Sequence, residues 1–494
     1  MPTEPMILAI DQGTTNTKAI LVDGAGVVRG MASRPVDIEF PRPAWVQQDA
    51  RSIWESVREA VDECLGSSGS PPLAAVGISN QRESGLAWEA ATGEPVGPVV
   101  TWQCRRSADF CERLRSEGLE DEVRTRTGLP IDPMFTGSKI RWLLDDTPDG
   151  HARAAQGDIR VGTVDSWLLW CLTGGAVHRT DVSNASRTQL LNISEGRWDA
   201  LLMERYGVPE AALPQILPSS GIFGETVALG ALPAGVPIGS LVGDSHAALF
   251  GHAGFAAGSV KATYGTGSSL MSPTAQRVDS DRGLASTIAW GLGSTVYALE
   301  GNIYVTGAAV QWMADFIGLD GPGKVADLAE TVPDTEGVYL VPAFVGLGAP
   351  HWDDGARGLL TGLTRSSSLA QAARAVIESI AYQVRDVFDE MQSATGGALR
   401  VLMADGGVTR NTQLMQFQAD ILGVPVQRNN TPELSAMGAA YLAGLAVGVW
   451  SSTDEIEALP RSIDRFEPTI GAAERERLYG GWQQAVARTM YRPS

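Results

Sequence analysis

The sequence predicts an α/β fold divided into two domains that face each other across a central cleft. Three observations support this prediction. The chain has 494 residues, which is too many for a single hydrophobic core. Patterns typical of strands and of helices alternate along it. Glycine-rich turns follow strands near the start of the chain and again past its middle. We therefore predict that residues 1–251 form the first domain and residues 252–494 the second.

An apolar strand, a tight polar turn and a second strand open the chain. The strand at 7–10 runs into Asp-Gln-Gly-Thr-Thr-Asn at 11–16, and the apolar strand at 18–22 follows at once, with a third short strand near 27–28. Such a turn exposes backbone N–H groups and two hydroxyls, which suit the oxygens of a phosphate chain. Asp11 stands at the strand end, where it could hold Mg²⁺ through water.

Two later turns have a similar composition. Thr-Tyr-Gly-Thr-Gly at 263–267 follows a short strand at 260–262, and Asp-Gly-Gly at 405–407 follows a strand at 399–404. The first turn taken alone could be only a hairpin. Because comparable turns recur past the middle of the chain, we interpret them together as a clamp for nucleotide phosphates.

Other strands and helices complete the coarse prediction. Short buried strands are expected at 74–79 and 238–242, and helices at 52–65 and 139–144. The longest apolar stretch, 437–450, contains three glycines and is too short to cross a bilayer comfortably. We therefore predict that it forms a buried helix.

Composition favours a cytoplasmic protein that binds neither nucleic acid nor membranes. The formal net charge is -19, and such a surface repels both nucleic acid and anionic lipid. The four cysteines form no C-x-x-C pair or regular framework, which is typical of free thiols in a reducing cytosol. No basic-then-apolar leader precedes Met6, so secretion is not expected.

Two common nucleotide-binding motifs are absent, and one segment has two interpretations. The sequence contains neither Gly-x-x-x-x-Gly-Lys-Ser/Thr nor Gly-x-Gly-x-x-Gly. Gly-Asp-Ser-His-Ala at 243–247 could place the Asp244 carboxylate at a strand end as a general base. It is also a near match to the Gly-x-Ser-x-Gly elbow of serine hydrolases, with Ser245 as nucleophile. No His-Gly-Gly-Gly oxyanion motif accompanies it, which argues against the hydrolase.

Polar side chains that follow two strands point to a small hydroxylated ligand. Arg82 and Glu83 come just past the strand at 74–79, and Trp102 follows another apolar segment. Strand ends are where α/β sheets bind ligands. Arg82 and Glu83 together can recognise vicinal hydroxyls, and Trp102 can cover the C–H face of a polyol. The alternative is a surface ion pair beside a core tryptophan.

The order of these motifs resembles that of the FGGY carbohydrate kinases, most closely the glycerol kinase branch, over nearly the whole chain. The resemblance implies two actin-like (ribonuclease H-like) α/β domains that close on ATP and a sugar or polyol. It implies phosphorylation of a terminal hydroxyl, with the acceptor on the N-terminal side and the nucleotide on the C-terminal side, and a homodimer or homotetramer. The matching segments are 11–15, 77–83, 102–106, 128–133, 162–165, 184–188, 263–267, 341–350, 405–407 and 438–444.

The resemblance also implies roles for individual residues. Asp244 is similar to the base that takes the proton from the attacking hydroxyl, and Asp11 to a carboxylate associated with Mg²⁺. The positions that would bind ATP are Thr14, Thr15, Asn16, Lys18, Thr266, Gly267, Gly307, Gln311, Gly407 and Asn411. The positions that would bind the acceptor are Arg82, Glu83, Trp102, Met134, Asp244, Ser245 and Ser269.

Several positions depart from the pattern of the glycerol kinase branch. Met134 stands in place of Tyr, Ser245 of Gln and Ser269 of an aromatic residue, so the pocket should be wider and its rim more polar. Each missing buried partner costs ~1–3 kcal/mol, which disfavours glycerol. We therefore expect a larger acceptor, such as erythritol, threitol, a pentitol or xylulose. Lys18 replaces an Arg, and Gly235 replaces an Arg that binds a sugar bisphosphate inhibitor in bacterial relatives.

Two interpretations from other classes stay open beside the kinase. An actin-like ATPase would make Arg82, Glu83 and Trp102 incidental, and its ATP hydrolysis would not respond to polyols. A serine hydrolase would depend on Ser245, which a fluorophosphonate probe would label.

Overall fold

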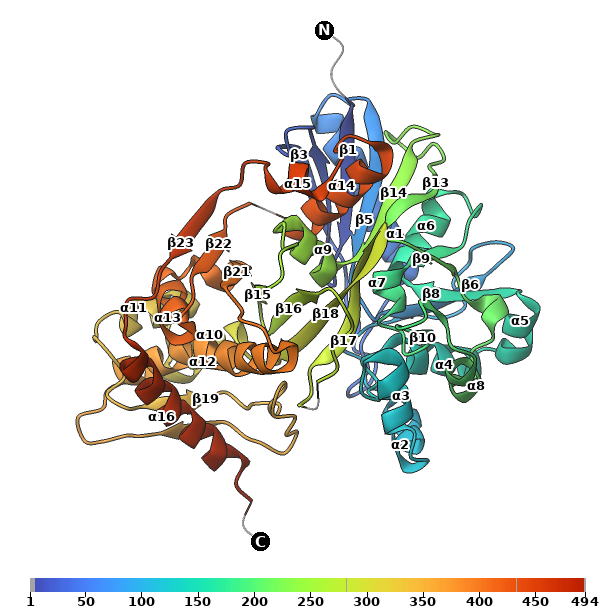
Figure 1. The fold of residues 1–494 in the computed structure, drawn as a ribbon. Coiled ribbons are helices and arrows are strands. Elements are labelled where there is room, and N and C mark those ends of the chain that lie inside the picture. The colour runs from blue at the N-terminus through green and yellow to red at the C-terminus, as the bar shows by residue number, and fades with distance from the viewer. Residues whose placement is uncertain (1–4, 281, 432, 493–494) are drawn as a thin grey trace.

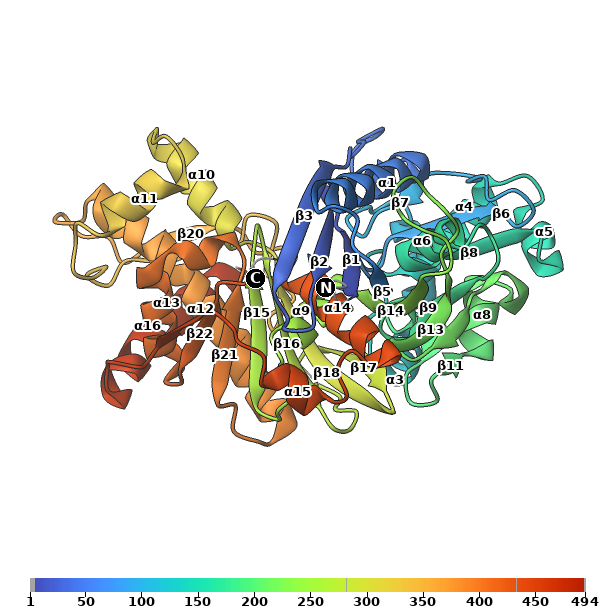
Figure 2. The same cartoon turned by 90° about the horizontal axis from the view of Figure 1, so that it is seen from above.

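The computed structural model describes residues 5–280, 282–431 and 433–492, and it confirms the α/β fold. Two large sheets stand beside each other, the first formed by the N-terminal half and the second by the C-terminal half (Figure 1). Viewed from above, α9 (Asp244–Gly251) and α14 (Leu434–Val447) lie between the two sheets (Figure 2). Each sheet and the helices around it enclose their own apolar core.

The central strands of the first sheet run parallel, so their carboxyl ends share one edge. The register pairs Gln12 and Gly243 with Asn80, and the residues that follow these three positions are therefore neighbours. Antiparallel strands flank the parallel ones on both sides. In order across the sheet the strands are β13 (Ser220–Glu225), β14 (Pro237–Gly243), β5 (Leu73–Asn80), β1 (Met6–Gln12), β2 (Asn16–Val22) and β3 (Val28–Pro35).

The second sheet repeats the order and direction of the first, with β17 added at one edge. In both sheets an antiparallel β-hairpin leads into parallel strands, and an antiparallel strand closes the far edge. The hairpins β1–β2 and β15–β16 therefore occupy equivalent places. The strands in order are β17 (Ala285–Leu292), β18 (Ser294–Ile303), β16 (Ser268–Thr274), β15 (Ser259–Tyr264), β21 (Val401–Asp405), β22 (Val426–Asn429) and β23 (Ile463–Phe466).

Smaller sheets and the remaining helices surround these two sheets. The small strands are β4 (Gln47–Gln48), β6 (Gly85–Glu89), β7 (Val99–Val100), β8 (Ile159–Thr163), β9 (Arg179–Asp181), β10 (Leu191–Asn192), β11 (Arg197–Trp198), β12 (Gln215–Leu217), β19 (Tyr339–Val341) and β20 (Leu359–Thr361). The helices are α1 (Ala50–Ser67), α2 (Ala108–Ser116), α3 (Glu120–Thr127), α4 (Thr136–Asp146), α5 (Gly150–Gln156), α6 (Val164–Leu172), α7 (Val182–Ala185), α8 (Ala200–Tyr206), η1 (Glu210–Ala212), α10 (Gly307–Ile317), α11 (Pro322–Ala329), α12 (Leu369–Thr395), η2 (Gly407–Arg410), α13 (Thr412–Leu422), α15 (Thr453–Glu457) and α16 (Ala472–Met490).

The predicted helices form, with bounds that their caps explain. α1 is longer than the predicted 52–65 by two residues at each end. It begins at Ala50 because the Asp49 side chain accepts a hydrogen bond from the Arg51 N–H and caps the first turn. α14 confirms the buried helix predicted at 437–450, although it begins earlier and ends at Val447, before the left-handed Gly448. In the part of the chain that the structure describes, no helix is both long and apolar enough to span a membrane.

Backbone-to-backbone contact joins α9 and α14. A Cβ added to Gly438 would lie 1.8 Å from the carbonyl oxygen of Ala247, and one added to Gly251 would lie 2.3 Å from that of Leu434. Although α14 comes late in the sequence, it packs on β1, β5 and β14 of the first sheet, and Gly77 makes room for the carbonyl of Ala439. The two halves are therefore joined through this helix pair.

We expect Gly438→Ala to lower the unfolding midpoint, because the added methyl would force the two helices apart at a cost of about 1–3 kcal/mol. Gly480→Ala is the matched control, since a Cβ at this helical glycine meets nothing within 4 Å. That control should gain about 0.5–1 kcal/mol through helix propensity. Thermal unfolding followed by circular dichroism measures both, and equal midpoints for the two variants would contradict the close contact.

Candidate functional site

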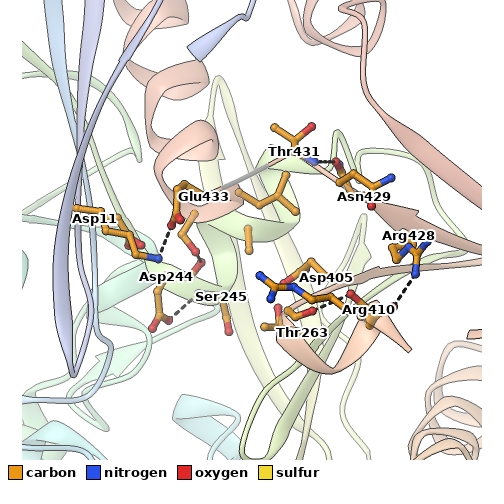
Figure 3. A pocket seen from close by; sticks show the side chains of 18 residues that line it. Asp11, Asp244, Ser245, Thr263, Asp405, Arg410, Arg428, Asn429, Thr431 and Glu433 are labelled. Atoms are coloured by element: carbon orange, nitrogen blue, oxygen red, sulfur yellow. Dashed lines mark hydrogen bonds and ion pairs between the residues drawn. The ribbon is translucent and has the colours of Figure 1, made fainter. Parts of the chain in front are cut away.

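A cavity of about 750 Å³ lies between the two halves, at the carboxyl edge of the parallel strands. Figure 3 shows side chains from both halves around it, with Asp11 and Asp244 on one side and Asp405, Arg410 and Arg428 on the other. The predicted site residues that line this cavity are Asp11, Lys18, Asp244, Ser245 and Gly407. Of the other predicted residues, Thr14, Thr15, Thr266 and Gly267 lie on the two hairpin turns, whereas Gln311 lies within α10 and Asn411 caps α13.

The first half contributes two carboxylates that the sheet register brings to one edge. Asp11 is near the end of β1, and Asp244 begins α9 directly after β14. The Oδ1 atom of Asp11 is buried and has no hydrogen-bond partner among the described residues. Burial raises the pKa of Asp11 to about 6, and the Asp244 carboxylate adds to this rise. A buried, unpaired oxygen next to a second carboxylate is an environment that a cation would stabilise.

The first predicted phosphate turn closes as a hairpin between β1 and β2. The Gly13 N–H donates to the Asn16 carbonyl at 2.9 Å, which leaves Thr15 and Asn16 exposed at the tip. The Thr14 hydroxyl accepts a 3.0 Å hydrogen bond from the indole N–H of Trp102. A residue assigned to the nucleotide therefore contacts one assigned to the acceptor.

Lys18 and Glu433 form an ion pair across the two halves. The Nζ atom of Lys18, on β2, lies 2.5 Å from Oε2 of Glu433, which precedes α14. Both side chains line the cavity, and Glu433 is labelled in Figure 3. Lys18 therefore has a protein partner that the sequence did not reveal.

The second predicted phosphate turn is the β15–β16 hairpin, held by the start of α10. The N–H groups of Thr306 and Ala308 donate to the Thr266 carbonyl at 2.9 and 3.1 Å, and that of Gly307 to Gly265 at 3.0 Å. A Cβ at Gly267 would lie 2.4 Å from the Ile303 carbonyl oxygen, so glycine is required there. Thr266 is exposed at the tip.

Gln311 and Asn411 have partners within their own helices. The Gln311 side chain, on α10, is exposed and donates to Asp315 at 2.8 Å. The Asn411 side chain caps α13 by accepting from the Leu414 N–H at 2.9 Å. Neither side chain lines the cavity as the structure describes it.

The third turn follows β21 and passes close to the second one. Gly406 has φ of 98°, and a Cβ there would lie 2.3 Å from the Tyr264 carbonyl oxygen. Gly407 begins η2 and lines the cavity. The Nε2 atom of buried His252, at the end of α9, lies 2.7 Å from Oδ2 of Asp405. Burial would raise the pKa of Asp405, but this hydrogen bond holds it below its ordinary value.

Two of the predicted acceptor residues, Arg82 and Ser245, donate hydrogen bonds to Asp244. The Arg82 Nε donates to Asp244 Oδ1 at 3.0 Å, and Glu83 is buried with a left-handed backbone at φ of 60°. Buried Lys139 donates to the carbonyls of Glu83, at 3.0 Å, and Met134. Burial lowers the pKa of Lys139 to about 7. Lys139 therefore links the backbone of two residues that the sequence assigned to the acceptor.

Ser245 and Ser269 belong to a chain of hydrogen bonds that also includes two buried charged residues. Lys261 donates to the Ser245 hydroxyl at 3.4 Å, Ser245 donates to Ser269 at 3.4 Å, and Ser269 donates to Glu300 at 3.3 Å. Lys261 and Glu300 are not among the predicted site residues. The signal that could have found them is a single charged residue inside an otherwise apolar strand, since both are fully buried.

Comparison with known proteins agrees with the motifs. The model of the FGGY family of carbohydrate kinases, N-terminal domain, matches residues 6–251, and that of the C-terminal domain matches residues 260–447. Glycerol kinases from Symbiobacterium thermophilum and Stenotrophomonas maltophilia are 49% and 50% identical to this chain, with 98% of each chain covered. The crystal structure of Plasmodium falciparum glycerol kinase with ADP has a TM-score of 0.95 at 31% identity and 99% coverage of both chains.

These matches confirm the actin-like architecture that the motifs implied, and they confirm an ATP-dependent kinase of a sugar or polyol. The two family models match the two halves of the chain in order, and the relatives are aligned over 98% of their own length. The chain belongs to the FGGY family of carbohydrate kinases.

Proposed function

We propose that the protein transfers the γ-phosphoryl group of ATP to a terminal hydroxyl of a small polyol or sugar, with Asp244 as the general base. The placement of Asp244 carries this proposal, because its side chain lines the cavity between the two halves beside Arg82. The Arg82 guanidinium and the Ser245 N–H both donate to Oδ1. Among the described contacts this leaves Oδ2 to accept the proton of the attacking hydroxyl.

Phosphoryl transfer needs positioning and charge stabilisation more than covalent chemistry. We assign the two hairpin tips and the turn at Gly406–Gly407 to the phosphates, since these segments expose backbone N–H groups without bulky side chains. In this assignment residues 1–251 hold the acceptor and 252–494 the nucleotide. Closure of the two halves would exclude water, which otherwise competes with the acceptor hydroxyl.

Asp11 fits a role in holding Mg²⁺. Its buried, unpaired Oδ1 suits an ion bound mostly through water and phosphate oxygens. Within the described residues no cluster of three or more His, Cys, Asp or Glu could hold a metal ion, which agrees with an ion that takes few protein ligands. When bound, Mg²⁺ would neutralise charge on the β- and γ-phosphate oxygens.

The acceptor is proposed to be larger than glycerol, in the range of four- and five-carbon polyols and ketoses. Ser245 lines the cavity, and its hydroxyl is linked to that of Ser269, another short side chain, only at 3.4 Å. A hydrogen bond of this length is weak, so a ligand hydroxyl could bind to either serine without breaking a strong hydrogen bond. Glycerol is the second candidate, favoured by the names of the relatives.

The serine hydrolase gains no support from the contacts of Ser245. Its hydroxyl contacts Ser269 and Lys261, and no histidine is among its described hydrogen-bond partners. His246 instead contacts Thr287 at 3.3 Å. A cytoplasmic location and a dimer or tetramer stay predictions, as does the absence of nucleic acid and membrane partners, which the net charge of -19 favours.

Asp244→Asn should lower kcat by about 10²–10⁴, because the amide cannot take the proton of the acceptor hydroxyl. ATP affinity should stay near the wild-type value, since Asp244 lies on the acceptor side. A coupled ADP-release assay and calorimetric titration with ATP measure the two quantities. Wild-type turnover in this variant would remove Asp244 from the mechanism.

Binding of Mg-ATP should weaken as pH falls through about 6, the pKa of Asp11, because the protonated group no longer stabilises the ion. In Asp11→Asn the affinity for Mg-ATP should no longer fall as the pH drops through about 6.

The pH dependence of protein stability that Asp11 causes has the opposite sign. With a pKa above the ordinary 3.8, Asp11 lowers the free energy of unfolding as pH rises from 3.8 to 6.

Calorimetric titrations with Mg-ATP at pH 5.5 and 7.5, compared for the two proteins, test this prediction, with about a fourfold weaker affinity at pH 5.5 expected for the wild type. Parallel curves would contradict it.

A panel of three- to seven-carbon polyols and ketoses should give a higher kcat/KM for a four- or five-carbon acceptor than for glycerol. The reason is the short side chains at Ser245 and Ser269. The same coupled assay measures it, with Ser269→Phe as a variant that should shift preference toward glycerol. Glycerol giving much the highest value in the wild type would contradict the larger acceptor.

A further inference from the structure

A network of buried ionised side chains lies at the acceptor side of the cavity. It consists of Arg82, Glu83, Arg187 and Glu300, whose side chains are between 0% and 7% exposed. Two positive and two negative groups balance within the network. Such groups are stable away from water only when each one is paired.

Glu300 stands at the centre of this network and engages both guanidinium groups. Its Oε1 lies 2.6 Å from NH1 of Arg82, and its Oε2 lies 2.6 Å from NH2 of Arg187. Each arginine then reaches one predicted acceptor residue. The Nε of Arg82 donates to Asp244 at 3.0 Å, and the Nε of Arg187 donates to Glu83 at 2.6 Å.

The network joins the two halves of the molecule. Glu300 belongs to β18 of the second sheet, whereas Arg82 and Glu83 follow β5 of the first and Arg187 follows α7. The direction of the acceptor-side groups is therefore set by a residue from the nucleotide-side half. Burial alone would raise the pKa of Glu300, but Arg187 and Arg82 hold it well below its ordinary value, so the carboxylate stays charged.

Glu300 also ends the chain of hydroxyl groups. The hydrogen bonds run from Lys261 to Ser245, from Ser245 to Ser269, and from Ser269 to Glu300. With a cation at one end and a carboxylate at the other, the hydroxyl hydrogens point toward Glu300. The serine oxygens can then accept hydrogen bonds from a ligand hydroxyl.

We propose that Glu300 is a positioning residue for the acceptor site, which aims Arg82 at Asp244 and Arg187 at Glu83 and orients the hydroxyls of Ser245 and Ser269. The proposal rests on the acceptor site assigned under the proposed function. Glu300 itself acts through the two arginines and Ser269. Its loss should therefore disturb binding and turnover of the acceptor and leave the nucleotide unaffected.

Glu300→Gln keeps the shape of the side chain and removes its charge. We expect kcat/KM for the acceptor to fall about 10- to 100-fold, which is typical of losing hydrogen bonds to a charged partner. The affinity for ADP, measured by calorimetry, should stay within about twofold, since the nucleotide contacts are elsewhere. Glu300→Asp restores the charge on a shorter side chain and should recover part of the lost kcat/KM.

Glu378→Gln is the matched control. Glu378 is a buried carboxylate on α12 that pairs with Arg374 at 2.7 Å and belongs to no part of the site. Glu378→Gln tests whether the loss of any buried Glu–Arg ion pair lowers kcat/KM for the acceptor in the same way. We expect the control to lower the unfolding midpoint without changing acceptor KM.

The outcomes separate this proposal from the proposed function. If the wild type phosphorylates no polyol or sugar, the proposed function fails and this proposal with it. If the wild type is active and Glu300→Gln keeps its acceptor KM and kcat, the positioning role alone is wrong. The positioning role would also be wrong if Glu300→Gln weakened acceptor binding and ADP binding to the same extent and lowered the unfolding midpoint. That pattern indicates that the substitution disturbs the folded structure as a whole.

Discussion

The contact between α9 and α14 is the constraint on which the site depends. Gly438 and Gly251 let the backbones of α9 and α14 come into contact, and this contact fixes the position of α9 relative to both sheets. Asp244, the first residue of α9, is positioned with it. The far end of α9 is fixed as well, since His252 pairs with Asp405 at the end of β21. The single short helix α9 thus connects Asp244 of the first half to the turn that follows β21 in the second half, and no loop intervenes.

Electrostatics at the base of the cavity follows from this packing. The closely joined halves exclude water from Arg82, Arg187 and Glu300, so each charge must find a partner inside the protein. The strong, short contacts lie within the ion network, whereas the contacts among the serines are long. The site therefore combines a rigid set of charged groups with a set of hydroxyls that can rearrange around a ligand.

The sequence was sufficient for the local parts of the structure and not for the long-range ones. The strand, turn and strand from Ile7 to Val22 follow from neighbouring residues, and the glycine-rich turns at 263–267 and 405–407 were recognisable in the same way. Glu300 was missed because its partner Arg82 is far away in the chain, and the charge that stands out in the strand of Glu300, like that in the strand of Lys261, does not by itself identify the partner. The packing of α14 on the first sheet was missed for the same reason, since nothing in an apolar helix states which sheet it covers.

The repeated strand order has a consequence for the origin of the molecule. Because α9 follows β14 and α14 follows β22, and these two strands occupy equivalent places in the two sheets, the two touching helices are counterparts. A strand order that repeats within one chain is expected when an ancestral gene of half the length is duplicated and fused. Asp244 and Glu433 stand at the start of the two counterpart helices, and the fused copies have diverged there, since one carboxylate pairs with Arg82 and the other with Lys18.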